Sequence, residues 1–310
     1  MLLPERLHKG DRVGIIAPAG PPNLMNLQKA ISFFEAFDLK VQYGKHIDKV
    51  HGYLAGTDEE RLCDFHDMVA NPDIKAIFFA RGGYGTARIA PYINYQLIKE
   101  NPKIIWGYSD ITYLHTAIRK HSNMITFHGP MAASDLGKEE LDERTTFHMW
   151  KQLFEPAEVA YTENTFGGSY PLKVIQSGEV EGQLVGGNLS LLVSSIGTPF
   201  EIDTKGKLLF IEDIGEEPYR IDSMLNQLKL SGKLSEAAGI IIGDFANAES
   251  KLPSSFTVEE VFEDYFSHLC CPVMSGFMIG HCLPHFAIPL GVRAKLSTDN
   301  KMLVVEPGVR

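Results

Sequence analysis

Residues 103–118 read KIIWGYSDITYLHTAI, an apolar run followed by apolar residues at helical spacing. This pattern predicts a buried strand that turns sharply into a helix, with the small hydroxyl residue Ser109 at the turn. Such a turn raises the Ser109 Oγ above the sheet edge, beside the unpaired backbone N–H groups of the helix's first turn, which can stabilise an oxyanion. The nucleophile-elbow motif G-x-S-x-G is incomplete here, since Ile111 takes the place of its second glycine. The alternative is that Ser109, or Asp110 beside it, merely caps the helix.

Strand-like and helix-like segments alternate on both sides of this stretch. Short apolar runs begin at residues 12 and 73, a helical pattern covers 24–37, and Thr57 with Glu60 forms a capping box before another helix. This alternation predicts a parallel sheet with helices on both faces. Ligands of such sheets lie at the carboxyl ends of the strands, where the sequences RGGYG (81–85) and GYSD (107–110) are both expected.

The second half of the chain has shorter, mostly strand-like segments, with helices expected near 188–196, 217–230 and 257–269. A chain of 310 residues is longer than a single hydrophobic core usually supports. We therefore predict an α/β N-terminal domain over 1–165 and a β-rich C-terminal domain over 170–310. They are joined where the regular alternation of strand-like and helix-like segments breaks down.

Composition narrows the possible functions. The chain has 29 basic and 39 acidic side chains, a net charge of −10, which argues against a nucleic-acid partner. We see neither a secretory signal nor an apolar run near the roughly 20 residues that span a bilayer, and expect no membrane association. The four cysteines form no C-x-x-C pair, which favours reduced thiols in the cytoplasm over disulfides or a zinc site.

The glycine-rich segment RGGYG fits neither the dinucleotide fingerprint G-x-G-x-x-G nor a phosphate-binding loop with G-K-[ST]. It is either a loop that lets backbone approach a ligand or a tight structural turn. If Ser109 is a nucleophile, a backbone N–H of Gly82 or Gly83 is well placed to be the second oxyanion donor.

A serine nucleophile needs a base and a group that orients the base. Among eleven histidines, His281 stands out because it follows the apolar run MSGFMIG in a loop bounded by glycine and proline. His285 lies four residues on, but Pro284 between them makes a helical metal site improbable. Glu212 ends the apolar run KLLFIED, where a carboxylate needs a partner, either a histidine or a nearby lysine or arginine.

Taken together, these segments resemble the LD-carboxypeptidase family of serine peptidases, which act on murein peptides. The resemblance rests on six motifs in the expected order: RGGYG at 81–85, GYSD at 107–110, GGNLS at 186–190, LFIED at 209–213, EEPYRID at 216–222, and GHxxP…PLG from 280 to 291. One position departs from the family pattern, because Ser223 stands where an arginine is common.

The resemblance implies a catalytic triad in which Ser109 is the nucleophile, His281 the general base and Glu212 the residue that orients the histidine. It also implies an oxyanion hole made by the backbone N–H groups of Gly83 and Asp110. The implied architecture is a flavodoxin-like N-terminal domain, a β-rich C-terminal domain and a homodimer. No metal or cofactor is expected.

The implied reaction releases the terminal D-alanine of a murein tetrapeptide during peptidoglycan recycling. A free terminal carboxylate calls for a cationic partner, and Arg81 and Arg220 are the candidates, although both can instead be structural. One alternative is an immunity peptidase of the same family that cleaves an aminoacyl- or peptidyl-nucleotide antibiotic. Another is a non-catalytic ligand-binding protein of this fold.

Overall fold

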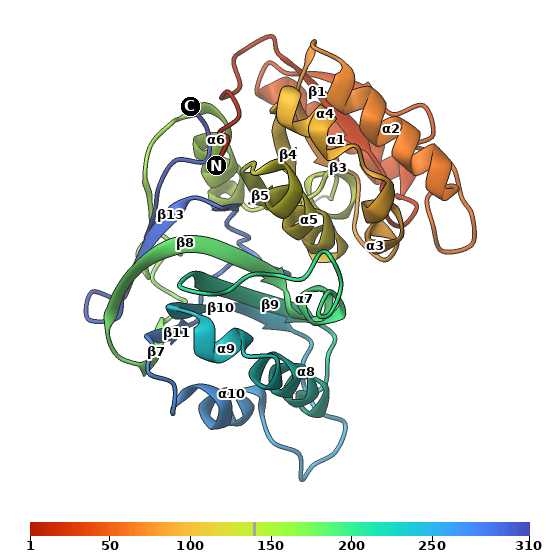
Figure 1. The fold of residues 1–310 in the computed structure, drawn as a ribbon. Helices are drawn as coiled ribbons and strands as arrows, with labels where there is room; N and C mark the ends of the chain where they lie inside the picture. Colours follow the sequence, from red (N-terminus) through yellow and green to blue (C-terminus); the bar gives the residue numbers. More distant parts are fainter. Residues whose placement is uncertain (139–140) are drawn as a thin grey trace. The chain divides into compact units, whose positions relative to one another are not determined.

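The computed structural model describes residues 1–138 and 141–310, which form two compact units (Figure 1). Unit 1 comprises Met1–Ala157 with two short stretches from the C-terminal end, Ala287–Leu290 and Pro307–Arg310. Unit 2 comprises Glu158–Phe286 and Gly291–Glu306. Among the described residues, no helix has the length and apolar character needed to cross a membrane.

Unit 1 is built on a six-stranded sheet in the order β12-β5-β4-β3-β1-β2. The strands are β1 (Arg12–Ile16), β2 (Lys40–Tyr43), β3 (Ile74–Phe79), β4 (Ile104–Trp106), β5 (Thr126–His128) and β12 (Ile288–Leu290). Strands β1 to β5 pair in parallel, and β12 pairs antiparallel with β5. The predicted parallel sheet is therefore present.

The helices of unit 1 are α1 (Leu24–Ala36), α2 (Asp58–Ala70), α3 (Thr86–Ile89), α4 (Tyr95–Glu100), α5 (Thr112–Ser122) and α6 (Glu143–Phe154). Short 3₁₀ turns cover Ala90–Tyr92 and Ser109–Ile111, and a π turn covers Ala132–Leu136. The capping box predicted before α2 is confirmed, since the Thr57 and Glu60 side chains each bond the other residue's backbone N–H.

Unit 2 contains an eight-stranded mixed sheet in the order β6-β14-β13-β8-β9-β10-β11-β7. Its strands are β6 (Val159–Tyr161), β7 (Lys173–Gln176), β8 (Glu179–Asn188), β9 (Leu208–Ile214), β10 (Gly239–Ala246), β11 (Val273–Ser275), β13 (Arg293–Ser297) and β14 (Met302–Val305). The four central strands, β8 to β11, are parallel, and the flanking pairs are antiparallel. The predicted fold class, an α/β domain followed by a β-rich one, is confirmed.

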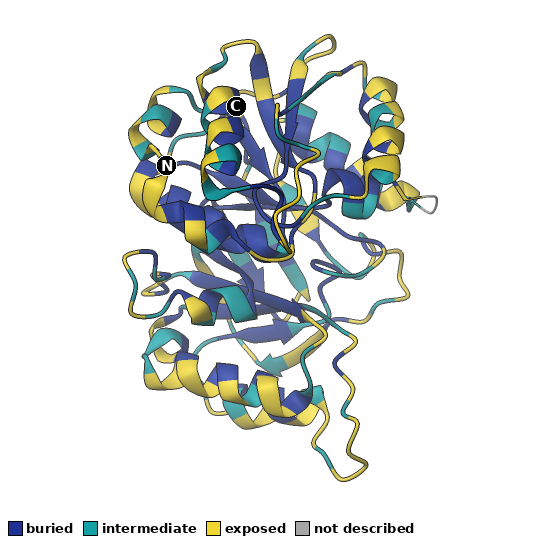
Figure 2. Ribbon diagram, turned by 90° about the vertical axis from the view of Figure 1, so that its right-hand side faces the viewer, coloured by how far each residue is buried: buried dark blue, intermediate teal, exposed yellow. Residues whose placement is uncertain are grey.

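Four helices belong to unit 2: α7 (Leu189–Ser194), α8 (Pro218–Leu230), α9 (Lys233–Glu236) and α10 (Val258–Phe266). Alternate residues of β9, such as Leu209 and Ile211, enter one hydrophobic cluster with Leu225 of α8 and Phe266 of α10. Figure 2 shows the result, with buried residues on the strands and on the inner stripes of the helices, and exposed residues on the outer stripes. Because neighbouring strand residues point to opposite faces, Glu212 lies on the sheet face opposite this cluster.

Candidate active site

Ser109 lies in unit 1 at the sharp turn that follows β4. Its φ of +62° is in the left-handed region, which non-glycine residues rarely adopt and which recurs at strained functional turns. Neither the 3₁₀ turn at Ser109–Ile111 nor α5 has a side-chain cap at its N-terminus. The structure therefore gives no support to the helix-capping role that was the alternative for Ser109 and Asp110.

The glycine-rich loop after β3 passes directly over this turn. A methyl group placed on Gly82 would lie 3.1 Å from the Ser109 Oγ and 3.3 Å from the Asp110 backbone nitrogen. Gly83 and Gly85 have φ values of +113° and +135°, which side-chain-bearing residues avoid. Glycines are thus needed both for the close approach of the loop to the Ser109 turn and for the backbone path of the loop. The two segments predicted to carry the oxyanion donors are in contact.

Hydrogen bonds fix the loop against the Ser109 turn. The Thr86 N–H donates to Asp110 Oδ2 over 3.0 Å, and the Thr86 hydroxyl donates to the Asp110 carbonyl over 2.7 Å. Buried Arg61 of α2 donates to the Gly85 carbonyl over 2.9 Å, to the Pro18 carbonyl, and to Asp58. Burial raises the pKa of Asp110, while the hydrogen bonds from Thr86 oppose that rise. These contacts hold backbone rather than substrate, so they position the site.

In unit 2, the two triad residues predicted for this half of the chain are hydrogen-bonded to each other. Oε2 of Glu212 lies 2.7 Å from Nδ1 of His281, and the Glu212 side chain is completely buried. Burial raises the pKa of Glu212, and the hydrogen bond from His281 opposes that rise. Because the carboxylate accepts from Nδ1, the neutral imidazole keeps its other nitrogen, Nε2, as a proton acceptor.

A glycine permits this close pairing. Gly280 precedes His281 with a φ of +125°, and a methyl group there would lie 2.8 Å from Glu212 Oε2. Glycine is therefore needed before the histidine for a steric reason, because a larger residue would collide with the carboxylate beside the loop.

Four polar residues around Glu212 were not singled out from the sequence. Asn188, at the end of β8, contributes a side-chain hydrogen bond that lowers the pKa of Glu212, and it donates to Asp213 Oδ1 over 2.9 Å. Asp213 also accepts from the Ser190 hydroxyl over 2.7 Å. Asp244, near the end of β10, is coupled electrostatically to His281, and burial raises its pKa. The signal for Asn188 and Ser190 was present in the GGNLS motif.

The two arginines predicted to bind carboxylate have different surroundings. Arg81 is exposed, and its Nη1 donates to the Pro21 carbonyl over 3.3 Å. Arg220 of α8 is also exposed and forms an ion pair over 3.3 Å with Glu216, one helical turn away. Ser109 and Arg81 belong to unit 1, and Glu212, His281 and Arg220 to unit 2, so their assembly into one site stays a prediction.

Comparison with known proteins identifies the family. Residues 13–129 match the model of the LD-carboxypeptidase N-terminal domain, and residues 181–296 match that of the C-terminal domain. The chain belongs to the LD-carboxypeptidase family. This confirms both the resemblance recognised from the motifs and the prediction of a serine peptidase.

Individual members of the family align over almost the whole chain. A probable murein peptide carboxypeptidase of Bacillus subtilis is 52% identical, over 99% of this chain and 95% of its own length. The structure of muramoyltetrapeptide carboxypeptidase from Oxalobacter formigenes superposes with a TM-score of 0.84 at 31% identity, covering 95% of this chain and 98% of its own. The structure of MccF in complex with glutamyl sulfamoyl guanosine superposes with a TM-score of 0.91 at 27% sequence identity. It covers 99% of this chain and 98% of its own.

Proposed function

We propose that this protein is a serine-type LD-carboxypeptidase that releases the terminal D-alanine from murein tetrapeptides. The observation that carries the assignment is the full-length, 52% identical relative named as a murein peptide carboxypeptidase. The hydrogen-bonded Glu212–His281 pair and the strained Ser109 turn supply the chemistry that a serine peptidase needs.

In the proposed mechanism, His281 Nε2 removes the proton from the Ser109 hydroxyl as Oγ attacks the carbonyl carbon of the penultimate residue. The carbonyl oxygen becomes an oxyanion, for which the N–H groups of Gly83 and Asp110 are the proposed donors. The imidazolium then gives its proton to the departing amine of D-alanine. Water, activated by the same imidazole, hydrolyses the acyl-enzyme. Buried Glu212 holds the imidazole in the productive tautomer and stabilises its charged form throughout.

The proposed role of Arg81 and Arg220 is to bind the terminal carboxylate of the substrate. A guanidinium group matches a carboxylate in a bidentate way, and both side chains are exposed to incoming ligand. Arg220 has to exchange its contact with Glu216 for the substrate, which is a small cost because exposed pairs contribute little.

The antibiotic-cleaving alternative is favoured by one observation, the similarity in structure to MccF. The sequence of MccF is 27% identical to this chain, whereas that of the murein peptide carboxypeptidase is 52% identical. Incubating the purified protein with murein tetrapeptide and, separately, with an aminoacyl sulfamoyl adenosine discriminates between the two. We expect D-alanine release from the first; turnover of the second alone would favour the alternative.

Ser109→Ala tests the proposed nucleophile. Its loss is expected to lower kcat by about 10³-fold or more, whereas a binding protein of this fold would keep its ligand affinity unchanged. A fluorophosphonate probe adds a test of assembly, because labelling of Ser109 should be rapid in the wild type and slow in His281→Ala. Equal labelling of both proteins would contradict the proposed triad.

We further propose a cytoplasmic location and a homodimer. Cys63, Cys270, Cys271 and Cys282 are all free thiols, and two of them are exposed, as suits a reducing compartment. The proposal of a homodimer rests on the family resemblance alone. Sedimentation of the purified protein, which gives the mass of the assembly, tests it.

A further inference from the structure

Two tyrosines on separate loops of unit 1 present their rings to solvent at one place. Tyr53, between β2 and α2, is 67% exposed, and Tyr84, between β3 and α3, is 51% exposed. Their ring centroids lie 5.7 Å apart at an interplanar angle of 64°, which is an edge-to-face contact. Because neither ring is buried in the core, both are accessible to a ligand.

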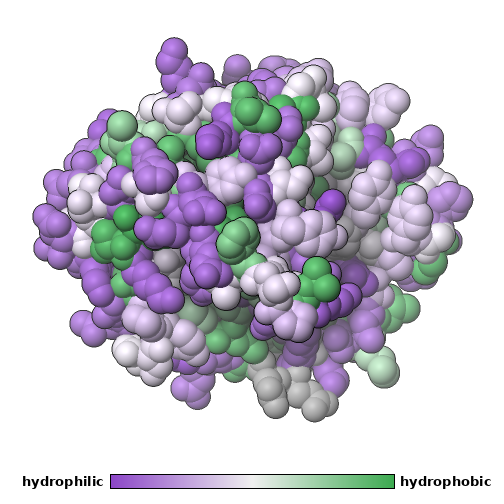
Figure 3. Space-filling model, turned by 90° about the horizontal axis from the view of Figure 1, so that it is seen from below, coloured by the Kyte–Doolittle hydropathy of each residue, from purple (hydrophilic) through white to green (hydrophobic). Residues whose placement is uncertain are grey.

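Exposed apolar side chains that occur singly need no ligand to explain them. The face of the molecule seen from below is of that ordinary kind, with hydrophobic side chains scattered among mainly hydrophilic ones (Figure 3). Tyr53 and Tyr84 differ from these, because two large rings from separate loops share one position on the surface.

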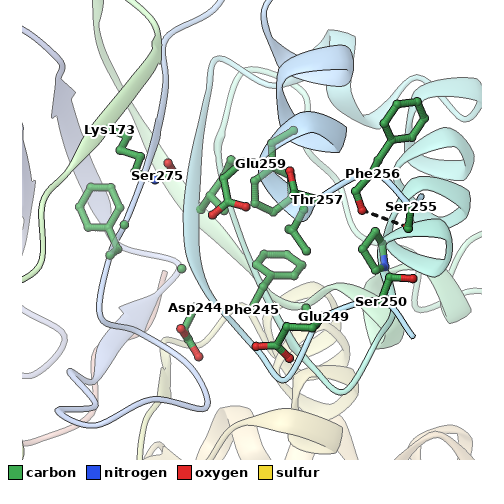
Figure 4. A pocket seen from close by; sticks show the side chains of 18 of the residues that line it. Lys173, Asp244, Phe245, Glu249, Ser250, Ser255, Phe256, Thr257, Glu259 and Ser275 are labelled. Atoms are coloured by element: carbon green, nitrogen blue, oxygen red, sulfur yellow. Dashed lines mark hydrogen bonds between the residues drawn. The ribbon is translucent and has the colours of Figure 1, made fainter. Parts of the chain in front are cut away.

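A cavity of about 570 Å³ in unit 2 is less directly connected with the reaction. It is formed by the end of β10, the loop that follows and the start of α10 (Figure 4). Ile242 and Phe262 of its wall belong to the hydrophobic cluster on the sheet face opposite Glu212, and Phe245 packs against that cluster. The apolar wall of this cavity is therefore part of the core on that face.

The loops that carry the two tyrosines leave the same edge of the sheet as the Ser109 turn. Strands β2, β3 and β4 all run parallel to β1, so the loops that follow them lie at one edge. Tyr84 is two residues from Gly82, where a methyl group would lie 3.1 Å from the Ser109 Oγ. Two residues of chain span at most roughly 7 Å. The tyrosine pair is therefore within reach of a substrate bound at Ser109.

Backbone contacts hold both loops in place. His51 and Leu54 exchange backbone hydrogen bonds of 2.8 and 3.0 Å, which close a tight turn that includes Tyr53. Leu54 is buried and packs against Gly85, where a methyl group would lie 2.7 Å from the Leu54 Cδ2. Rings carried on a fixed backbone lose little conformational freedom when a ligand stacks on them, which favours binding.

The charge beside the rings is paired. Arg88 interacts electrostatically with both phenols, and its Nε and Nη2 donate to the two carboxylate oxygens of Asp58 over 3.0 and 2.9 Å. The tyrosine pair therefore offers ring faces and phenol hydroxyls beside a cation that already has its partner. This surface suits an uncharged ring that carries hydroxyl groups. A pyranose is such a ring, because its C–H groups pack on aromatic faces and its hydroxyls hydrogen-bond to phenol oxygens.

We propose that Tyr53 and Tyr84 bind the sugar ring at the amino end of a murein tetrapeptide, so that the enzyme prefers peptides that still carry N-acetylmuramic acid. The inference rests on the proposed function. In murein, the amino end of the peptide is amide-linked to the lactyl group of this sugar, which leaves the sugar without charge.

The length of the substrate agrees with this placement. Only one residue, D-alanine, lies beyond the attacked carbonyl, so a more distant subsite can meet only the amino side of the substrate. The three residues on that side extend roughly 10 Å. This length is comparable to the two residues of loop between Gly82 and Tyr84 together with a tyrosine side chain.

Two substrates test the proposal: the tetrapeptide amide-linked to N-acetylmuramic acid, and the same tetrapeptide with an acetyl group at its amino end. Both lack the amino charge, and only the first carries the sugar. We expect the wild-type kcat/KM for the sugar-linked peptide to be about fivefold higher or more. The gain should appear in KM rather than in kcat, because a group remote from the reacting bond is bound equally in the ground and transition states.

Tyr53→Ala and Tyr84→Ala each remove one ring. In both variants we expect the ratio of the two kcat/KM values to fall towards one. Tyr92→Ala is the matched control, because Tyr92 is 69% exposed in the same unit and ends the short 3₁₀ turn after α3. That variant should keep the wild-type ratio. Since each ratio is measured on one protein, a general loss of activity cannot imitate the effect.

Equal kcat/KM values for the two substrates in the wild type would overturn the sugar-binding role of the tyrosine pair and leave the peptidase assignment intact. An unchanged ratio in both Tyr53→Ala and Tyr84→Ala, or an equal fall in Tyr92→Ala, would do the same. Failure to release D-alanine from either substrate would instead overturn the proposed function, and the sugar-binding role with it.

Discussion

Glu212 Oε2 accepts a hydrogen bond from His281 Nδ1 over 2.7 Å, with the carboxylate completely buried and the imidazole mostly so. The two residues lie 69 positions apart in the sequence. A buried carboxylate is costly, and burial raises the pKa of Glu212, while the hydrogen bond from His281 opposes that rise. The pair is therefore expected to serve catalysis more than stability.

Glu212→Gln tests this expectation. The amide is nearly the same size, but it carries no charge and no longer selects the Nδ1-protonated imidazole. We expect kcat to fall by about 10²–10⁴-fold, with the melting temperature unchanged or raised, because an uncharged side chain is cheaper to bury. Glu236→Gln, an exposed change in the same unit, should leave kcat unaltered. A Glu212→Gln enzyme with full activity would contradict the proposed role.

Gly280→Ala probes the space between the same two residues. The new methyl group would meet Glu212 Oε2 at 2.8 Å, and the φ of +125° adds backbone strain. We expect kcat to fall at least tenfold as the pair is pushed apart. Gly215→Ala is the matched control, because its φ of +73° is also unfavourable but nothing lies within 4 Å of the added methyl. If both variants lose activity equally, backbone strain and not the collision is responsible.

Thr86→Val tests whether the hydrogen bonds between the glycine-rich loop and the Ser109 turn position the oxyanion donors. The variant loses the 2.7 Å bond to the Asp110 carbonyl with little change in volume. We expect kcat to fall severalfold with KM little changed, since an oxyanion is bound only in the transition state.

The control for this change is Thr116→Val on α5, where another buried hydroxyl donates to a backbone carbonyl, that of Thr112, over 3.1 Å. Each valine substitution should lower the free energy of unfolding by about 1–3 kcal/mol. A parallel loss of kcat in the Thr116→Val enzyme would mean that destabilisation alone accounts for the effect.

The parallel sheet of unit 1 and the placement of RGGYG and GYSD at strand ends follow from residue patterns, because apolar runs and glycine turns are local signals. Strand β12 was not foreseen as part of this sheet, since three residues containing Pro289 carry no periodicity. Likewise, Glu212 was recognisable as a buried carboxylate in need of a partner. The GGNLS motif marks Asn188, but the contacts of its side chain could not be predicted, because they depend on how β8 lies beside β9 in three dimensions.

His115 of α5 offers a pH-dependent test of unit 1. Its ring is completely buried, its Nε2 donates to the Gly107 carbonyl over 2.7 Å, and burial lowers its pKa to about 4. The unfolded chain binds a proton on this histidine near pH 6.5, whereas the folded chain does not until about pH 4. Stability is therefore fully present above pH 6.5 and falls as the pH drops, by about 1.4 kcal/mol per unit.

His115→Gln keeps a side-chain N–H for the Gly107 carbonyl and cannot titrate. Whatever its stability at pH 7, we expect it to lose about 2 kcal/mol less than the wild type between pH 6.5 and pH 5, measured by urea unfolding. His268→Gln is the control, because that residue is exposed and solvent reaches it in both states. If the wild type and His115→Gln show the same pH dependence, His115 is not held neutral in the folded protein.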